Sequence, residues 1–257
     1  MQVDTGVDEV SPGVLDPRTA RTKFDLRKAA PSPVLAPFVE YFWRVSWDLS
    51  EEFTQRVVPH PNVHLVFEPD GTWVYGVLHG LFRRTLTGRG TVLGVRFHPG
   101  GFRPWLGARV STMTDERFAA ADLLPGFPPV AGIPDTDAAE AALLPLCPPP
   151  DPAVAEARAL VAAIADDLTL TRVDDLAARF DRTVRSVQRL FNEYVGVGPK
   201  WVIRRYRMHE AAARADEGGA VDWAALATDL GFSDQSHFTR EFTAAIGVPP
   251  ARYAAGR

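Results

Sequence analysis

The sequence predicts an α+β protein: a small antiparallel β-barrel or sandwich, a helical connector, and an all-α C-terminal domain with two helix-turn-helix motifs joined by a long helix. Three observations lead to this prediction. Apolar and polar residues alternate with period two in the stretch 37–98, Ala- and Leu-rich runs fill 114–166, and the C-terminal third contains an internal repeat.

Length and composition favour a folded chain of two domains. The chain has 257 residues, of which 46% are hydrophobic and 23% charged. No apolar run approaches the ~18 residues that a membrane helix needs, and the acidic start lacks the layout of a signal peptide. The single cysteine, Cys147, builds neither a disulfide framework nor a Cys-rich zinc site. We therefore expect a soluble cytoplasmic protein without membrane contact.

The sequence of the N-terminal half predicts several short strands. The segment "YFWRVSWDL" alternates, "NVHLVFEPDGTWVYGVLHG" predicts two strands around a Pro-Asp-Gly turn, and "LFRRTLTGRGTVLGVRFHPGG" predicts two more around Gly88-Arg89-Gly90. The segment "FRPWLG" predicts a short helix over one end. We divide the chain into a loose lead-in (1–35), a β-rich domain (36–113), a helical connector (114–156) and the C-terminal domain (157–257).

The repeat sets "LAARFDRTVRSVQRLFNEYVGVGP" beside "LATDLGFSDQSHFTREFTAAIGVPP". Ala177 matches Ala227, and Arg189 matches Arg240 after a slip of one residue near the turn. Each copy is a short helix, a tight turn and a second helix, which is the helix-turn-helix layout. Gly231 supplies the second turn, and we expect Ser233 and Thr183 to be the N-caps of the second helices.

The second helix of each copy has one apolar and one polar face. Phe238 and Phe242 are four residues apart and share a face, while polar and basic side chains occupy the other. A helix in the DNA major groove needs such a buried face together with donors and acceptors for bases and phosphates. The segment "PKWVIRRYRMHEAAARA" predicts one rod from about residue 199 to 215, about 25 Å long, between the copies.

Basic charge is concentrated in this region although the net charge is −4. Eight Lys and Arg residues lie between 178 and 210, against three acidic ones. By itself this pattern is equally typical of a solvated helical surface.

These motifs resemble the DNA-binding domain of AraC/XylS family transcription regulators. The resemblance covers about residues 157–253, and its strongest segments are "GFSDQSHFTREF" with "GVPPARY", "VQRLF" with "GVGP", and "RYRMHEA". The first copy departs from the usual pattern, since Asp181 stands where a turn glycine is common. Aspartate tolerates the left-handed backbone.

The resemblance implies a sequence-specific regulator that binds two successive major grooves of double-stranded DNA. By position, the DNA-binding residues are Arg185, Ser186, Gln188 and Arg189 on the first recognition helix and Gln235, Ser236, His237 and Arg240 on the second. Candidate phosphate contacts are Thr183, Lys200, Arg204 and Arg205. His209 is expected on the surface of the linker helix.

The resemblance also bears on the N-terminal half and on partners. In many family members this half is a cupin-like β-barrel that senses a small molecule or mediates dimerisation. We take Trp43, Trp73, Tyr75 and His64 as effector-pocket candidates, with plain core packing as the alternative for the aromatic residues. An effector-free regulator whose N-terminal domain serves protein contact stays open. RNA polymerase and a homodimer are further candidate partners, and the connector helices pair two chains or pack on their own domains.

An enzyme is not expected. No phosphate loop, nucleophile elbow or HExxH motif occurs in the sequence. A DNA-repair enzyme with an AraC-like module is the remote alternative, but Cys147 lacks the basic neighbours that favour a thiolate. His60 and His64 are too far apart on a strand to share a metal ion. We therefore expect no metal and no cofactor.

Overall fold

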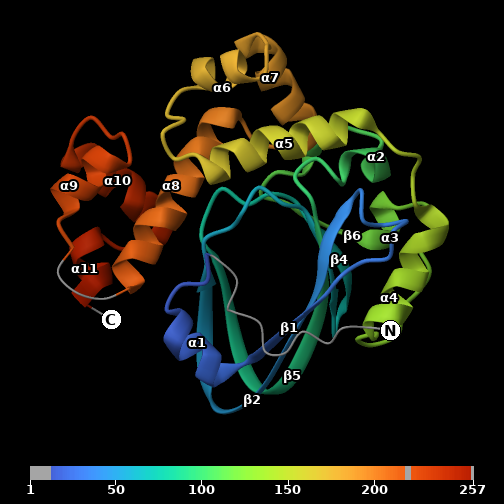
Figure 1. Cartoon of the computed structure of the whole chain (residues 1–257). Coiled ribbons are helices and arrows are strands. Elements are labelled where there is room, and N and C mark those ends of the chain that lie inside the picture. The colour runs from blue at the N-terminus through green and yellow to red at the C-terminus, as the bar shows by residue number, and fades with distance from the viewer. Residues whose placement is uncertain (1–12, 218–220, 256–257) are drawn as a thin grey trace.

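The computed structural model describes residues 13–217 and 221–255. Its N-terminal part is one six-stranded antiparallel sheet in the order β1-β2-β5-β3-β4-β6. The strands are β1 (Asp25–Ala29), β2 (Val39–Val57), β3 (His64–Glu68), β4 (Gly71–Tyr75), β5 (Phe82–Phe97) and β6 (Arg117–Ala119). The sheet is strongly curved (Figure 1), and β1 and β6 are its edges, so the expected barrel or sandwich is an open, curved sheet.

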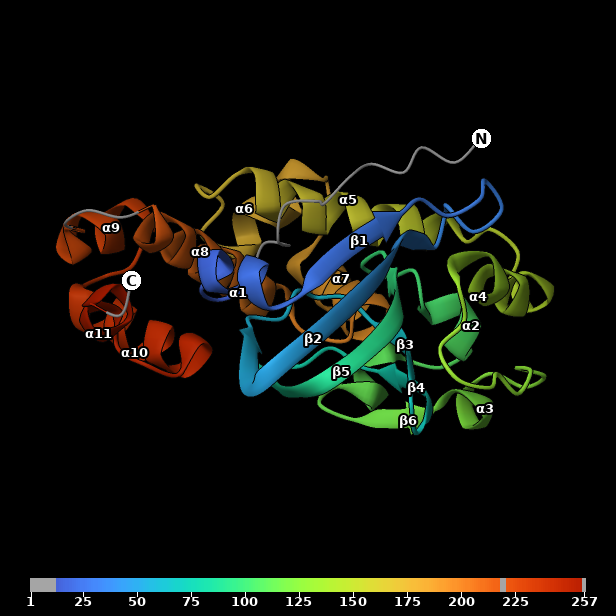
Figure 2. The ribbon, with the colours of Figure 1, turned by 90° about the horizontal axis from the view of Figure 1, so that it is seen from below.

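The helices form three groups along the chain. The first is α1 (Pro17–Lys23), before β1. The second covers the sheet with α2 (Arg103–Leu106), α3 (Ala120–Leu123), α4 (Thr136–Leu143) and α5 (Pro152–Asp166). The C-terminal group is α6 (Val173–Arg179), α7 (Val184–Leu190), α8 (Pro199–Asp216), α9 (Trp223–Asp229), α10 (Gln235–Ile246) and α11 (Pro250–Ala255). Figure 2 shows α9–α11 at the far end of α8 from the sheet.

Several expected elements are confirmed, among them the β3–β4 hairpin around Pro69-Asp70-Gly71, the short helix α2 and the continuous helix α8. Others are wrong. Residues 17–29 of the supposed lead-in form α1 and β1, "DERF" contributes to β6, and the boundary expected after residue 156 falls inside α5. Residues 1–12 of the lead-in lie outside the described residues.

The turn expected at Gly88-Arg89-Gly90 is also wrong, because β5 runs through it as a single strand paired with β2. Gly90 lies opposite Trp47, and Gly94 opposite Trp43. The indole rings cover these glycines so closely that an added Cβ would clash with the ring of Trp47 at Gly90 and with that of Trp43 at Gly94. The glycines therefore give the tryptophans room inside a continuous strand.

A bulge bends the long β2–β5 ribbon. The register of the two strands shifts between Leu49 and Phe53, and Gly88 opposite the bulge has a φ of 55°. A bulge increases strand bending and twist. In Figure 1 the two strands curve round at the lower end.

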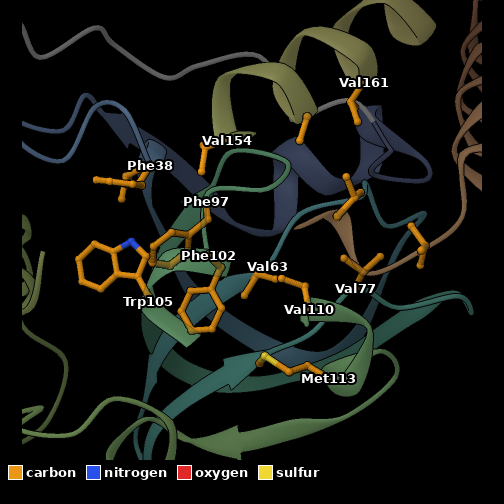
Figure 3. Packing of buried hydrophobic residues seen from close by; sticks show 14 of the residues in the cluster. Phe38, Val63, Val77, Phe97, Phe102, Trp105, Val110, Met113, Val154 and Val161 are labelled. Carbon is orange, nitrogen blue, oxygen red and sulfur yellow. The ribbon is translucent and has the colours of Figure 1, made fainter. Parts of the chain in front are cut away.

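Two hydrophobic cores hold the molecule together. The first packs the other face of the sheet against α2, α4 and α5 and continues without a break into the α6–α7 motif, through Val187 and Phe191. Figure 3 shows Phe97, Phe102, Trp105 and Val154 meeting in this core. The second core belongs to α8–α11 and includes Leu15 and Val58 of the N-terminal part. The connector thus packs on its own chain.

Candidate nucleic-acid interface and effector cavity

The first helix-turn-helix motif consists of α6, a turn and α7. Asp181 in the turn has a φ of 51°, the left-handed conformation expected for it. Thr183 is the N-cap of α7, as predicted, and its Oγ1 accepts a hydrogen bond from the Ser186 amide. Val187 is buried, and Arg185, Gln188 and Arg189 are exposed on the opposite side. Ser186 is half-buried, and its hydroxyl donates to the Thr183 carbonyl.

The second motif consists of α9, a turn at Gly231 with a φ of 70°, and α10. Its N-cap is Asp234 rather than the predicted Ser233. The carboxylate of Asp234 accepts a hydrogen bond from the His237 amide at 2.7 Å, and the Ser233 hydroxyl donates a hydrogen bond to the same carboxylate. These hydrogen bonds hold the pKa of Asp234 below its ordinary value. The correction moves the helix start by one residue.

The outer face of α10 presents Gln235, Ser236 and Arg240 to solvent, as the sequence predicts. His237 is half-buried. Its ring packs edge-on against Phe232, and its Nδ1 lies 3.3 Å from the Ser233 hydroxyl. Phe238 and Phe242 are fully buried on the inner face. His237 is therefore held by contacts within its own motif.

The cations on the two recognition helices lack acidic partners. Within the described residues, Arg185, Arg189 and Arg240 form no ion pair, whereas Arg179 pairs with Asp167 and Arg182 with Glu156. Unpaired, exposed guanidinium groups are available to phosphates and to guanine edges. Arg189 and Arg240 occupy equivalent places in the two copies of the repeat.

Helix α8 carries the remaining phosphate candidates, and one of them is wrong. Lys200 is exposed, and Arg204 bonds Glu241 of α10 at 2.9 Å. Arg205 is only 5% exposed, donates to the His79 carbonyl in the sheet domain and lies over the Trp201 ring. Its guanidinium therefore docks α8 on the sheet domain, and burial lowers its pKa to about 10.

His209 is a second correction. It is packed against the sheet domain, with its ring stacked on His60 at a centroid distance of 4.0 Å. Burial holds the pKa of His209 well below its ordinary value, with the nearby His60 as the next cause. The expectation of a surface residue failed because helical periodicity does not reveal that α8 packs on another domain as well as on its own motifs.

The hollow of the curved sheet holds a cavity of about 250 Å³. Its walls are mostly aromatic and aliphatic, and they include three of the predicted pocket residues, Trp43, Tyr75 and His64. Trp73 is not among the lining residues. It lies on β4 outside the cavity, where Arg117 packs over its ring at 4.3 Å. His60, the stacking partner of His209, also lines the cavity.

Other chemistry has little support in the described part of the chain. No group of three His, Cys, Asp or Glu side chains there is arranged to hold a metal ion. None of its helices has the length and apolar character that a bilayer crossing requires. Burial raises the pKa of the Cys147 thiol, which disfavours the thiolate.

Comparison with known proteins gives two family matches. Residues 27–119 match a domain of unknown function (DUF6597), and residues 176–256 match a helix-turn-helix domain. A search of the curated proteins found no match.

Solved structures similar to the chain include the following three. The C-terminal domain of AraT, a response regulator from Geobacillus stearothermophilus, is 20% identical, with 39% of this chain and 84% of that chain covered and a TM-score of 0.37. An AraC-type transcriptional regulator from Chromobacterium violaceum is 19% identical over 39% and 94%, with a TM-score of 0.34. ToxT from Vibrio cholerae is 12% identical over 83% and 98%, with a TM-score of 0.40.

Proposed function

We propose that the chain, whose residues 176–256 match a helix-turn-helix domain, is a DNA-binding transcription regulator of the AraC/XylS type, and that its two helix-turn-helix motifs bind one face of the duplex in two successive major grooves. The observation that carries the proposal is the pair of equivalent exposed arginines, Arg189 and Arg240, on helices joined by one continuous helix. Helix α8 has 18 residues and so spans about 27 Å. That length is comparable to one turn of DNA, about 34 Å.

Tandem binding also has a thermodynamic reason. Each recognition helix offers only a few polar side chains, which is a small surface for tight specific binding. When one motif is bound, the rigid linker makes binding of the second intramolecular, which raises its effective concentration. The two helices present different residues, "RSVQR" and "QSHFTR", so the bound site is asymmetric.

Footprinting on a selected operator tests the tandem arrangement. Arg189→Ala and Arg240→Ala should each weaken binding by about 1–3 kcal/mol if the arginine reads a guanine, at positions about 10 base pairs apart. Arg179→Ala is the matched control, because Arg179 is exposed nearby but paired with Asp167. A short palindrome in which each half-site is read by one helix per chain would rule out the tandem arrangement.

We also propose that a small molecule in the sheet cavity modulates DNA binding. This proposal is supported by the position of His60. It lines the cavity and also stacks on His209 of α8, the helix that joins the two motifs. A ligand that displaces His60 changes the packing of α8. It shifts the regulator between states only by its differential affinity for them.

This coupling is testable with any compound that raises the melting temperature of the chain. In the native chain the compound should also change operator affinity. In His209→Ala it should still raise the melting temperature, while its effect on operator affinity should shrink. A compound that stabilises both proteins and changes operator affinity in neither supports the alternative of an effector-free regulator.

A further inference from the structure

Two polar groups in the sheet cavity bear on which hydrogen-bonding groups a ligand would need. The first belongs to His64 on β3. Trp43 Nε1 donates a hydrogen bond to His64 Nδ1 at 3.2 Å, across the position that Gly94 leaves open. A neutral ring that accepts at Nδ1 carries its proton on Nε2. His64 lines the cavity, so this Nε2–H is a donor in the cavity wall.

Burial keeps this histidine neutral. Desolvation is the main cause that lowers the pKa of His64 to about 3, and the positive charge of Arg96 adds to it. At neutral pH the ring is therefore a hydrogen-bond donor without charge.

The second group is the amide of Gln55 on β2. Its side chain lines the cavity and is 7% exposed. Nε2 donates to the Arg56 carbonyl at 2.7 Å, whereas Oε1 is buried and has no partner among the described residues. A buried acceptor without a partner is rare in native structures and calls for a ligand or a water. The cavity thus offers one donor and one free acceptor.

The charged groups of the cavity, in contrast, are already neutralised. Arg96 pairs with Glu40 at 2.8 Å and also bonds the Tyr41 hydroxyl and Asn62 Oδ1. An anionic ligand would have to take Arg96 from its carboxylate partner.

Glu68 is neutralised in the same way. It accepts from the Tyr75 hydroxyl at 3.0 Å and lies 3.5 Å from Arg84. A cationic ligand would have to displace Arg84. Neither sign of charge is favoured, because each pair has one member that is largely buried, Arg96 or Glu68, and breaking the pair leaves that charge without its partner.

Resting on the effector role proposed above, we propose that the cavity binds an uncharged aromatic molecule with one hydrogen-bond acceptor for His64 and one donor for Gln55. An engineered cavity of about 150 Å³ holds benzene, so a volume of about 250 Å³ fits a compact ligand of about two rings. The rings of Trp43 and Trp47 provide the matching walls.

The test is isothermal titration calorimetry of the full chain with four matched naphthalenes. 6-Acetyl-2-naphthol has both polar groups, 2-acetylnaphthalene lacks the donor, 6-ethyl-2-naphthol lacks the carbonyl, and 6-hydroxy-2-naphthoate carries a charge. We expect 6-acetyl-2-naphthol to bind most tightly. Each of the other three should bind about tenfold more weakly, because each loses one hydrogen bond or forces a partly buried ion pair to break.

Two variants assign the partners. In His64→Phe the advantage of acetyl over ethyl should vanish, and in Gln55→Leu the advantage of the hydroxyl should vanish. Trp73→Phe is the control, since Trp73 lies on β4 outside the cavity, and it should leave all four affinities unchanged. The comparison of ligands on the native chain holds even if a variant fails to fold.

The outcomes separate this inference from the proposed function. If 6-hydroxy-2-naphthoate binds as tightly as 6-acetyl-2-naphthol or more tightly, the uncharged class is wrong, although the cavity is still a ligand site. If none of the four binds, the inference fails while operator binding, measured separately, still stands. If ligands bind but operator affinity never changes, the effector role fails and the ligand class survives.

Discussion

At the scale of single residues, Phe238 decides whether the second motif folds. Its ring is fully buried. The centroid of this ring lies 5.4 Å from that of Phe232 and 5.6 Å from that of Phe242. We expect Phe238→Ala to lower the free energy of unfolding by about 3–5 kcal/mol, because it leaves a cavity that the rings cannot refill. Chemical denaturation of the full chain measures this loss.

The control for Phe238 is Arg240→Ala, two residues further along the same helix. Arg240 is exposed, so this variant should unfold like the native chain and lose operator affinity instead. Native stability in Phe238→Ala would contradict the packing described for α10.

His64 makes stability depend on pH. Its folded pKa of about 3 lies below the ordinary value of 6.5, so below pH 6.5 the unfolded chain takes up a proton that the folded chain refuses. Stability therefore falls as pH drops from 6.5 toward 3. Between pH 7 and pH 5 His64 should account for at most about 2 kcal/mol of the loss.

Denaturation curves at pH 7 and pH 5 check this against His64→Asn, which should lose less stability on acidification. The pKa values of His98 and His209 are also lowered by burial, so a reduced pH dependence should persist in the variant. If both proteins lost the same free energy of unfolding between pH 7 and pH 5, the neutral state of His64 in the folded chain would be contradicted.

Single residues also mark the limit of sequence reasoning. The exposed faces of α7 and α10 follow from helical periodicity, and the structure has Arg185, Gln188, Gln235 and Arg240 at the surface as expected. Arg205 and His209 could not be placed in this way. Their burial depends on where α8 meets the sheet domain, which is a tertiary contact that leaves no periodic signal.

At the scale of elements, the N-cap of α10 offers a clean test. Because the Asp234 carboxylate accepts from the His237 amide, Asp234→Ala should destabilise the chain. Ser233→Ala removes only a hydroxyl that supports this carboxylate, and it should cost less. Denaturation of both variants compares the two positions, and a larger loss for Ser233→Ala would restore it as the cap.

Among the strands, hairpins with strong turn residues were predictable and long ribbons were not. Pro69-Asp70-Gly71 marked the β3–β4 turn correctly. Gly88 and Gly90 looked like a similar signal, but they lie within β5, opposite a bulge and a covering tryptophan. A glycine in a turn and a glycine inside a paired strand look alike in the sequence. Only the pairing with the partner strand distinguishes the two.

At the scale of the whole molecule, Arg205 reports whether the sheet domain stays docked when DNA binds. Arg205 is buried, so Arg205→Ala should leave the salt dependence of operator affinity unchanged. Arg185→Ala should reduce the slope of log K against log salt by about 0.9 if Arg185 contacts a phosphate. Fluorescence anisotropy between about 50 and 200 mM salt measures both slopes.

A reduced slope for Arg205→Ala as well would mean that α8 leaves the sheet domain on the operator. Arg205 would then become free to contact a phosphate. In that case the contact with the His79 carbonyl describes only the DNA-free state.

The uninterrupted first core has a consequence for how such regulators can be recombined. A fusion that joins this sensor half to a foreign reader half at residue 157 would cut α5 and strip Val154 and Leu160 from the partners they share with Phe191. The fusion protein would expose apolar surface on both of its halves. Exchange of α9–α11 would spare this first core, because these helices belong to the second core, but the replacement would still have to fit α8, Leu15 and Val58.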